Sequence, residues 1–136
     1  MKEDQNAYQE LIELARSAAE KTYSPYSHYP VGAAALTVEG RVFSGCNVEN
    51  ASFGGTICAE RTALVKAVSE GFCRFKAVAV VCSKAHECWP CGICRQFMSE
   101  FGVDIDVIVE GADGRLQRSK LAELLPQHFG PGDLPG

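Results

Sequence analysis

Apolar residues near the start of the chain recur with the period of an α-helix. From about residue 5 to residue 22, every third or fourth position is apolar, and the charged residues fall on the opposite face. This pattern predicts one amphipathic helix with a single buried side. Pro25 ends it, because proline lacks an amide hydrogen and restricts the residue before it. The segment offers no candidate for catalysis, so we expect its role to be structural.

Five later segments have the apolar content and the turn boundaries of β-strands. Residues 75–82 are almost continuously apolar, as expected of a strand that is buried on both faces. The first two segments are joined by Glu39-Gly40, a short turn that predicts a β-hairpin. The predicted strands are Val31–Val38, Arg41–Cys46, Phe75–Cys82, Ile105–Val109 and Leu116–Arg118.

Three further helices are expected between and after these strands. Ile57–Glu70 and Cys91–Phe101 both have apolar residues in helical register. A short last helix is expected to follow Ser119 as its N-cap, with Glu123 near the capping-box position. Strands that alternate with helices predict a layered α/β fold, here as one domain over residues 1–136.

The composition is that of an ordinary globular domain, and it narrows the classes of partner. The 136 residues are 46% apolar and 22% charged, which suits one domain with a hydrophobic core. No apolar run approaches the roughly 18 residues that cross a membrane. Met1–Gln5 lacks the apolar core of a signal peptide, so we expect a cytoplasmic protein. The formal net charge of −4, without a basic block, argues against nucleic-acid binding and favours a small neutral substrate.

Three of the seven cysteines have a spacing that predicts a metal site. Cys58 is expected in the first turn of one helix, and Cys91 and Cys94 in the first turn of the next, where positions i and i+3 share a face. Three thiolates can hold one zinc ion and leave its fourth position open, whereas structural zinc sites almost always use four protein ligands. Zinc lowers the pKa of a bound water from about 15.7 towards about 7. Glu60 is placed to carry protons without being a ligand.

Positive groups near the two helix starts would offset the charge of such a site. Three thiolates on Zn²⁺ leave a net charge of −1, which weakens the metal as a Lewis acid. Each helix N-terminus carries roughly half a positive charge and offsets part of it. Arg61 and Arg95 are candidates for donating hydrogen bonds to the sulfurs. For Arg95, an exposed position on the helix surface is an equal alternative.

Further motifs lie on both sides of the cysteines. They are Ser24-Pro25-Tyr26-Ser27, Val31-Gly32-Ala33-Ala34, Gly45-Cys46-Asn47-Val48-Glu49-Asn50-Ala51, Cys58-Ala59-Glu60-Arg61, Pro90-Cys91-Gly92-Ile93-Cys94, Leu124-Leu125-Pro126 and Phe129-Gly130-Pro131. In content, order and spacing they resemble the small homotetrameric cytidine deaminases, from about Tyr23 to Leu134. The resemblance implies a three-layer α/β/α sandwich with a mixed five-stranded sheet. It also implies zinc-dependent hydrolysis of cytidine and 2′-deoxycytidine to uridine and 2′-deoxyuridine, with release of ammonia.

The resemblance also assigns the residues of the metal site. Cys58, Cys91 and Cys94 would hold one Zn²⁺ per chain. Glu60 would take the proton of the attacking water and pass protons to the base. Arg61 would donate a hydrogen bond to a zinc-bound sulfur.

A second group of residues is implied to contact the nucleoside. Asn47 and Glu49 resemble the pair that hydrogen-bonds the ribose hydroxyls, because an amide donates and accepts and a carboxylate accepts from O–H groups. Tyr29 stands where the family usually carries Phe near the base and sugar, and Ala59 is also implied as a contact. Phe129 would come from a neighbouring subunit of a tetramer and pack on the base.

The sequence departs from the family at Trp89 and Ile93, where a Ser and a smaller residue are usual. Trp89 would narrow the pocket, pack at a subunit contact or shift the substrate preference. Cys88 raises two other interpretations. With Cys91 it forms a Cys-x-x-Cys redox motif, and as a fourth zinc ligand it would make a structural site in a binding module. Neither interpretation uses Glu60. Relatives that deaminate blasticidin S share the zinc motifs but are less similar around residues 47–50, which favours a nucleoside.

Overall fold

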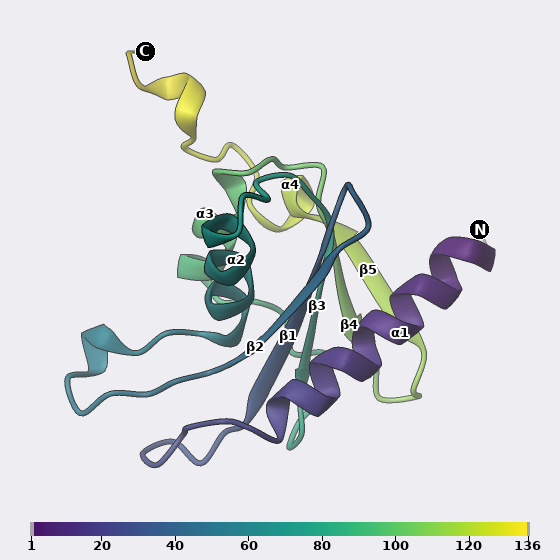
Figure 1. The fold of residues 1–136 in the computed structure, drawn as a ribbon, viewed down its shortest axis with the longest axis vertical. Helices are drawn as coiled ribbons and strands as arrows, with labels where there is room; N and C mark the ends of the chain where they lie inside the picture. The colour runs from purple at the N-terminus through teal and green to yellow at the C-terminus, as the bar shows by residue number, and fades with distance from the viewer. Residues whose placement is uncertain (1, 136) are drawn as a thin grey trace.

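The protein is built around a mixed five-stranded sheet, described here from a computed structural model that covers residues 2–135 (Figure 1). Met1 and Gly136, the ends of the predicted domain, lie outside the described residues. The strand order is β2-β1-β3-β4-β5, in which β3 and β4 run parallel and the other neighbours antiparallel. The strands are β1 Val31–Thr37, β2 Val42–Cys46, β3 Phe75–Cys82, β4 Asp106–Glu110 and β5 Leu116–Lys120.

Helices cover both faces of this sheet, which gives the predicted three-layer α/β/α arrangement. The helix α1 (Lys2–Ala19) lies across one face, and α2 (Ala59–Ser69) and α3 (Gly92–Ser99) lie on the other (Figure 1). A short α4 (Leu121–Leu124) follows β5. Two single-turn 3₁₀ helices complete the chain, η1 (Phe53–Gly55) and η2 (Pro131–Asp133). Among residues 2–135, no helix has the length and apolar character needed to span a bilayer.

Successive side chains of the central strands point to opposite faces of the sheet, and this produces two separate hydrophobic cores. In β1, Ala34 packs towards α1, whereas Ala33 and Ala35 pack towards α2 and α3. The small side chains on the α1 side let that helix approach closely: a Cβ added at Gly32 would lie 1.9 Å from the carbonyl oxygen of Ala15. Every residue of β3 except Lys76 is buried, as its continuous apolar run predicts.

The structure moves several predicted element boundaries by one or more residues, and the end of the first helix and the start of the last helix show why. The helix α1 ends at Ala19, because the amides of Glu20 and Lys21 bond to carbonyls three residues back and tighten the last turn. Ser119 is not the N-cap of the last helix, because antiparallel pairing with β4 extends β5 through Lys120. Lys120 is the cap instead, and its amide donates to the carboxylate of Glu123 at 3.1 Å, so the predicted partner is present.

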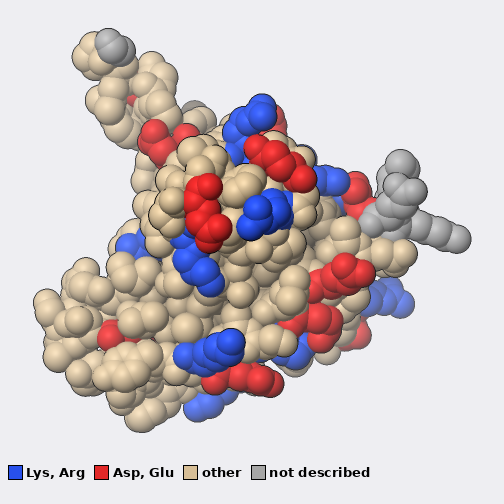
Figure 2. Space-filling view, viewed as in Figure 1, with Lys and Arg blue, Asp and Glu red and all other residues tan. Residues whose placement is uncertain are grey.

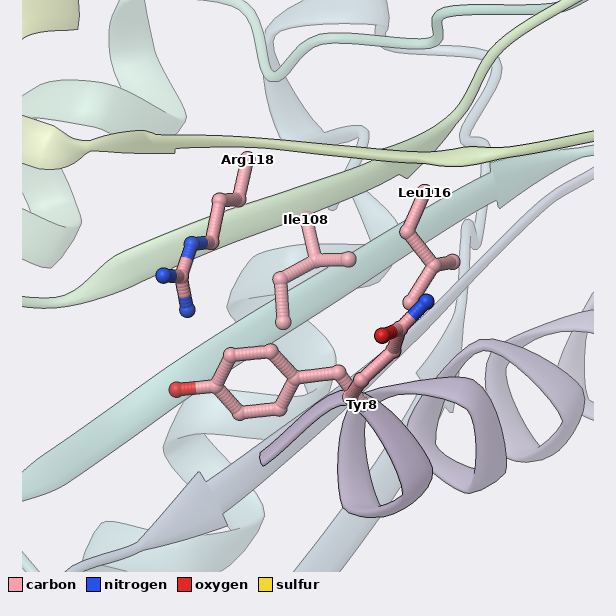
Figure 3. Close-up of a pocket in the computed structure, with 5 residues that line it drawn as sticks. Tyr8, Ile108, Leu116 and Arg118 are labelled. Atoms are coloured by element: carbon pink, nitrogen blue, oxygen red, sulfur yellow. The ribbon is translucent and has the colours of Figure 1, made fainter. Parts of the chain in front are cut away.

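A pocket of about 230 Å³ lies between α1 and the strands β4 and β5 (Figure 3). Tyr8, Ile108, Leu116 and Arg118 line it, together with Gln5. The hydroxyl of Tyr8 donates to buried Asp106 at 2.6 Å, and Lys120 pairs with the same carboxylate at 2.8 Å. These bonds tie α1 to the sheet, and the pocket opens on the opposite side of the sheet from the three predicted metal-binding cysteines.

Candidate metal centre

The sulfurs of Cys58, Cys91 and Cys94 converge at the starts of α2 and α3. Their ligand atoms all lie within 4.8 Å of one another, and the sulfurs of Cys58 and Cys91 are 3.8 Å apart. Four-coordinate zinc with bonds of about 2.3 Å to sulfur separates its ligands by about 3.8 Å. The predicted group of three is therefore spaced to hold zinc.

Cys58 and Cys91 are cap residues and do not lie in the first helical turn as predicted. Both have extended backbone, with φ −70° and ψ 155° at Cys58 and φ −69° and ψ 171° at Cys91. The predicted helix at Ile57 begins two residues later, because Ile57 forms a two-way backbone bridge with Val48. The bridge fixes the chain that leads into Cys58. Both caps place a thiol beside a helix N-terminus, where negative charge is stabilised.

The electrostatics of the three sulfurs favour thiolate at one of them. Hydrogen bonding with the Cys94 thiol lowers the pKa of Cys58 to about 5, and the guanidinium of Arg61 also lowers it. The same contact with Cys58, together with burial, raises the pKa of the Cys94 thiol. Without a metal, the pair therefore keeps one proton at neutral pH. Zinc binding has to release it, since zinc binds thiolate.

Arg61 takes the predicted position beside a sulfur. Its Nη2 lies 3.6 Å from the sulfur of Cys58 and also donates to the carbonyl of Thr56 at 3.2 Å. Its buried Nε has no hydrogen-bond partner among the described residues. Among the hydrogen bonds of the described residues, Arg95 has none to the three sulfurs. It donates from Nε to Pro90 at 2.8 Å and from Nη1 to Leu124 at 2.9 Å, and so ties α3 to α4.

Arg61→Gln is expected to weaken zinc binding while the fold is retained. The guanidinium hydrogen bond stabilises the Cys58 thiolate, and loss of such an outer group typically costs about 10- to 100-fold in metal affinity. Competition with a chromogenic chelator measures the dissociation constant. Arg115→Gln is the control, because Arg115 is highly exposed and, within residues 2–135, its one ion pair is with Asp113. A zinc dissociation constant within about twofold of wild type would remove Arg61 from this role.

Glu60 lies in the first turn of α2, and its side chain is turned into the protein. The residue is only 4% exposed. Burial raises the pKa of its carboxyl to about 7, and the negative charge of Cys58 adds to the rise. A carboxyl with a pKa near neutral can accept and return a proton at physiological pH. The structure thus brings three thiols and one buried carboxyl together. Proton transfer by Glu60 stays a prediction.

Asn47 and Glu49 shape the loop formed by residues 23–30. The amide of Asn47 accepts from the backbone N–H of Val31 at 3.1 Å and donates to the carbonyl of Tyr29 at 2.8 Å. Glu49 accepts from the backbone and hydroxyl of Ser27, and these bonds lower the pKa of its carboxyl. One amide hydrogen of Asn47 is not used in these contacts. Contact of either residue with ribose stays a prediction.

A pocket of about 320 Å³ opens beside this loop. It is lined by Tyr26, Ser27, Glu49, Phe53 and Thr56. Thr56 also accepts the hydrogen bond of Arg61, so the pocket adjoins the surroundings of the metal centre. Sequence reasoning missed Ser27 and Thr56, because single hydroxyl residues in loops have no spacing that marks a site.

The other residues predicted to contact the nucleoside differ in how exposed they are. The side chain of Ala59 is wholly buried in the core, so its methyl group offers no surface to a substrate. Tyr29 is 41% exposed. Phe129 is 58% exposed on a tail that projects away from the sheet and helices (Figure 1). The only side-chain bond to its backbone in the described chain comes from Gln96, at 2.7 Å.

Cys88 does not belong to the group of three sulfurs found among residues 2–135. Burial raises the pKa of its thiol to about 12. The four-sulfur structural site therefore has no fourth ligand there. Trp89 is half-buried and packs against the core beneath α2 and α3.

The sequence and the fold are similar to those of known proteins. Residues 5–110 match the family model of the cytidine and deoxycytidylate deaminase zinc-binding region. The chain is 43% identical over 127 residues to the cytidine deaminase of Sporosarcina psychrophila, covering 93% of each chain. It is 45% identical over 132 residues to a probable cytidine deaminase of Dictyostelium discoideum, covering 96% of this chain and 89% of the relative. The crystal structure of cytidine deaminase from Burkholderia pseudomallei superposes with a TM-score of 0.83 at 46% identity, over 89% of this chain and 98% of the other.

Proposed function

The chain belongs to the cytidine and deoxycytidylate deaminase family, and on that premise we propose that it hydrolyses cytidine and 2′-deoxycytidine to uridine and 2′-deoxyuridine, with release of ammonia. One observation carries the proposal. Three converging sulfurs lie beside the buried carboxyl of Glu60, whose pKa is raised to about 7. A purely structural zinc site needs a fourth protein ligand and gives Glu60 nothing to do.

The chain's own residues account for the proton transfers. Zinc held by Cys58, Cys91 and Cys94 supplies Lewis acidity and a water of lowered pKa. Glu60 accepts the proton of the water that attacks C4 of the base. It passes this proton to N3, then takes the proton of the hydroxyl now bound to C4 and passes it to the amino group. The carbonyl forms at C4 as the C–N bond breaks and ammonia leaves. Burial suits Glu60 to both steps, because its carboxyl is neither strongly acidic nor permanently protonated near pH 7.

The surroundings of the centre support a nucleoside substrate. Asn47 retains an amide hydrogen, and Glu49 faces the pocket of about 320 Å³ as a carboxylate. The hydroxyls of ribose can donate to Glu49 and accept from Asn47. A 5′-phosphate near Glu49 would meet a like charge, and no lysine or arginine lines this pocket.

A substrate panel tests this proposal. Purified zinc-loaded protein is expected to deaminate cytidine and 2′-deoxycytidine at similar kcat/KM. It should act on 2′-deoxycytidine 5′-monophosphate at least about 100-fold more slowly, the factor that one unfavourable charged contact of roughly 3 kcal/mol produces. Blasticidin S, an amine substrate of relatives, serves as the comparison compound. Faster turnover of the nucleotide or of blasticidin S would contradict the assignment.

We also propose that the active form is a cytoplasmic homotetramer, to which Phe129 contributes from a neighbouring chain. The described cysteines are all free thiols, as is usual in a reducing compartment. Large apolar side chains are exposed around the loops near the site and on the tail, namely Tyr26, Val48, Phe53, Ile57, Ile93, Phe129 and Leu134. In Figure 2 few charged side chains are seen on the lobe that these loops form at the lower left, or on the tail, which projects separately at the upper left. Exposed apolar surface of this extent marks interaction sites.

The mass in solution checks this state. Light scattering coupled to size-exclusion chromatography is expected to give four times the 14.7 kDa chain. Phe129→Ala should raise KM for cytidine more than it lowers kcat, since the ring packs on the base. A fully active species with the mass of one chain would contradict the tetramer.

A further inference from the structure

The side-chain amide of Asn47 is almost fully used by contacts within the protein. Its Oδ1 accepts from the backbone N–H of Val31 at 3.1 Å and from the hydroxyl of Thr22 at 2.5 Å. A carbonyl oxygen has two lone pairs, so both are taken. The Nδ2 of Asn47 donates to the carbonyl of Tyr29 at 2.8 Å, and the described residues give the second hydrogen of this nitrogen no partner. Asn47 can therefore offer a ligand one N–H donor.

These partners fix which way the amide faces. The N–H of Val31 can only donate and the carbonyl of Tyr29 can only accept, so a flip of the amide would break both bonds. The hydroxyls of Thr22 and Ser24 lie 2.9 Å apart. Each carries one hydrogen, and Oδ1 of Asn47 can only accept, so Thr22 donates to Asn47 and Ser24 donates to Thr22. The two hydroxyls form a chain that ends on the oxygen of Asn47.

Main-chain hydrogen bonds hold the Thr22 hydroxyl in place without a ligand. The backbone N–H of Thr22 donates to the carbonyl of Ala19 at 3.2 Å, in the turn that follows α1. The N–H of Tyr23 donates to the carbonyl of Asn47 at 3.0 Å, and the N–H of Glu49 donates to the carbonyl of Tyr23 at 2.8 Å. The end of the first helix and the segment after β2 are therefore joined at one point by both backbone and side chains.

We propose that Thr22 is a positioning residue for nucleoside binding: its hydroxyl holds the amide of Asn47 so that the remaining N–H is presented to a ring hydroxyl of the ribose. The proposal rests on the proposed function, because that function uses Asn47 as a ribose contact. Thr22 acts through Asn47 and does not itself touch the nucleoside. Its effect is therefore expected on the affinity for substrate and not on the proton transfers at Glu60.

Replacement of Thr22 by valine removes the hydroxyl and keeps the branched shape of the side chain. KM for cytidine is expected to rise about 3- to 10-fold, the range that one net hydrogen bond allows, with zinc content unchanged. The change in kcat should stay within about twofold, because the chemistry at Glu60 is untouched. Thr22→Ser keeps the hydroxyl and should give a KM within about twofold of wild type.

Two comparisons separate positioning from a general loss of stability. Thr37→Val is the matched control and should leave KM unchanged, because the Thr37 hydroxyl accepts from the N–H of Arg41 at 3.0 Å at the turn end of the hairpin, away from Asn47. With 2′,3′-dideoxycytidine, which lacks both ring hydroxyls, Thr22→Val should change kcat/KM by less than about twofold. Equal losses for cytidine and the dideoxynucleoside, or a KM for Thr22→Val within about twofold of wild type, would overturn the proposal.

A second measurement needs no turnover. The backbone N–H of Val31 is bonded to Asn47, so hydrogen exchange of peptides that contain Val31, followed by mass spectrometry, reports how firmly Asn47 is held. The exchange rate at Val31 should rise at least about threefold in Thr22→Val and stay unchanged in Thr22→Ser and Thr37→Val. An unchanged rate in Thr22→Val would overturn the contact. If wild-type protein failed to deaminate cytidine, the proposed function would fail, whereas this rate would still decide whether Thr22 holds Asn47.

Discussion

Replacement of Glu60 by glutamine is expected to remove nearly all turnover while zinc and fold are retained. Glutamine keeps the size of the side chain but cannot take a proton from water. General acid–base catalysis typically contributes about 10²- to 10⁴-fold, and here one carboxyl performs both directions of transfer, so we expect the upper end of that range in kcat. Steady-state kinetics on cytidine, with zinc measured on the same sample, provide the check.

A matched control lies on the same helix segment. Glu70 is the C-cap of α2 and is exposed, and its one ion pair in the described part of the chain is with Arg41 at 3.9 Å. Glu70→Gln should therefore leave kcat close to wild type. If Glu60→Gln and Glu70→Gln retained similar activity, Glu60 would have no part in proton transfer, and the buried carboxyl would be a structural feature.

Replacement of Cys91 by alanine is expected to abolish zinc binding and, with it, activity. Two sulfurs cannot hold the ion as three do, and the loss should exceed the roughly 10- to 100-fold expected for an outer group such as Arg61. Metal binding also contributes to folding free energy, so the melting temperature should fall towards that of chelator-treated wild type. Metal analysis and thermal unfolding measure the two effects.

Cys73→Ala is the matched control for this change. Cys73 is an exposed free cysteine outside the group of three sulfurs. The Cys73→Ala protein should keep one zinc per chain and full turnover. A Cys91→Ala protein that remained fully metallated and intact would refute the ligand assignment.

The sequence predicts most of the fold because the hydrophobic pattern is strong where the core is continuous. The apolar run of β3 gave its bounds without error, and the spacing of Cys91 and Cys94 placed two sulfurs on one face of α3. The residues at which α2 and α4 begin were not predicted correctly. Pairing of Ile57 with Val48 shifts the start of α2, and pairing with β4 shifts the start of α4. Both shifts come from contacts between distant residues, which local pattern does not contain.

The surroundings of the site were harder to predict for the same reason. Nothing in the sequence marks Pro90 and Leu124 as the partners of Arg95. The candidate metal-binding cysteines could be identified from their spacing in the sequence. The contacts that orient the residues around them could be seen only in the structure.

We propose that three cysteines hold one zinc ion that, with Glu60, deaminates cytidine. The most direct measurement is a titration of metal-free protein with zinc, with ammonia release from cytidine followed at each point. Activity should rise in proportion to zinc and level off at one ion per chain. Activity that is independent of added zinc in demonstrably metal-free protein, or no ammonia release at full zinc occupancy, would contradict it.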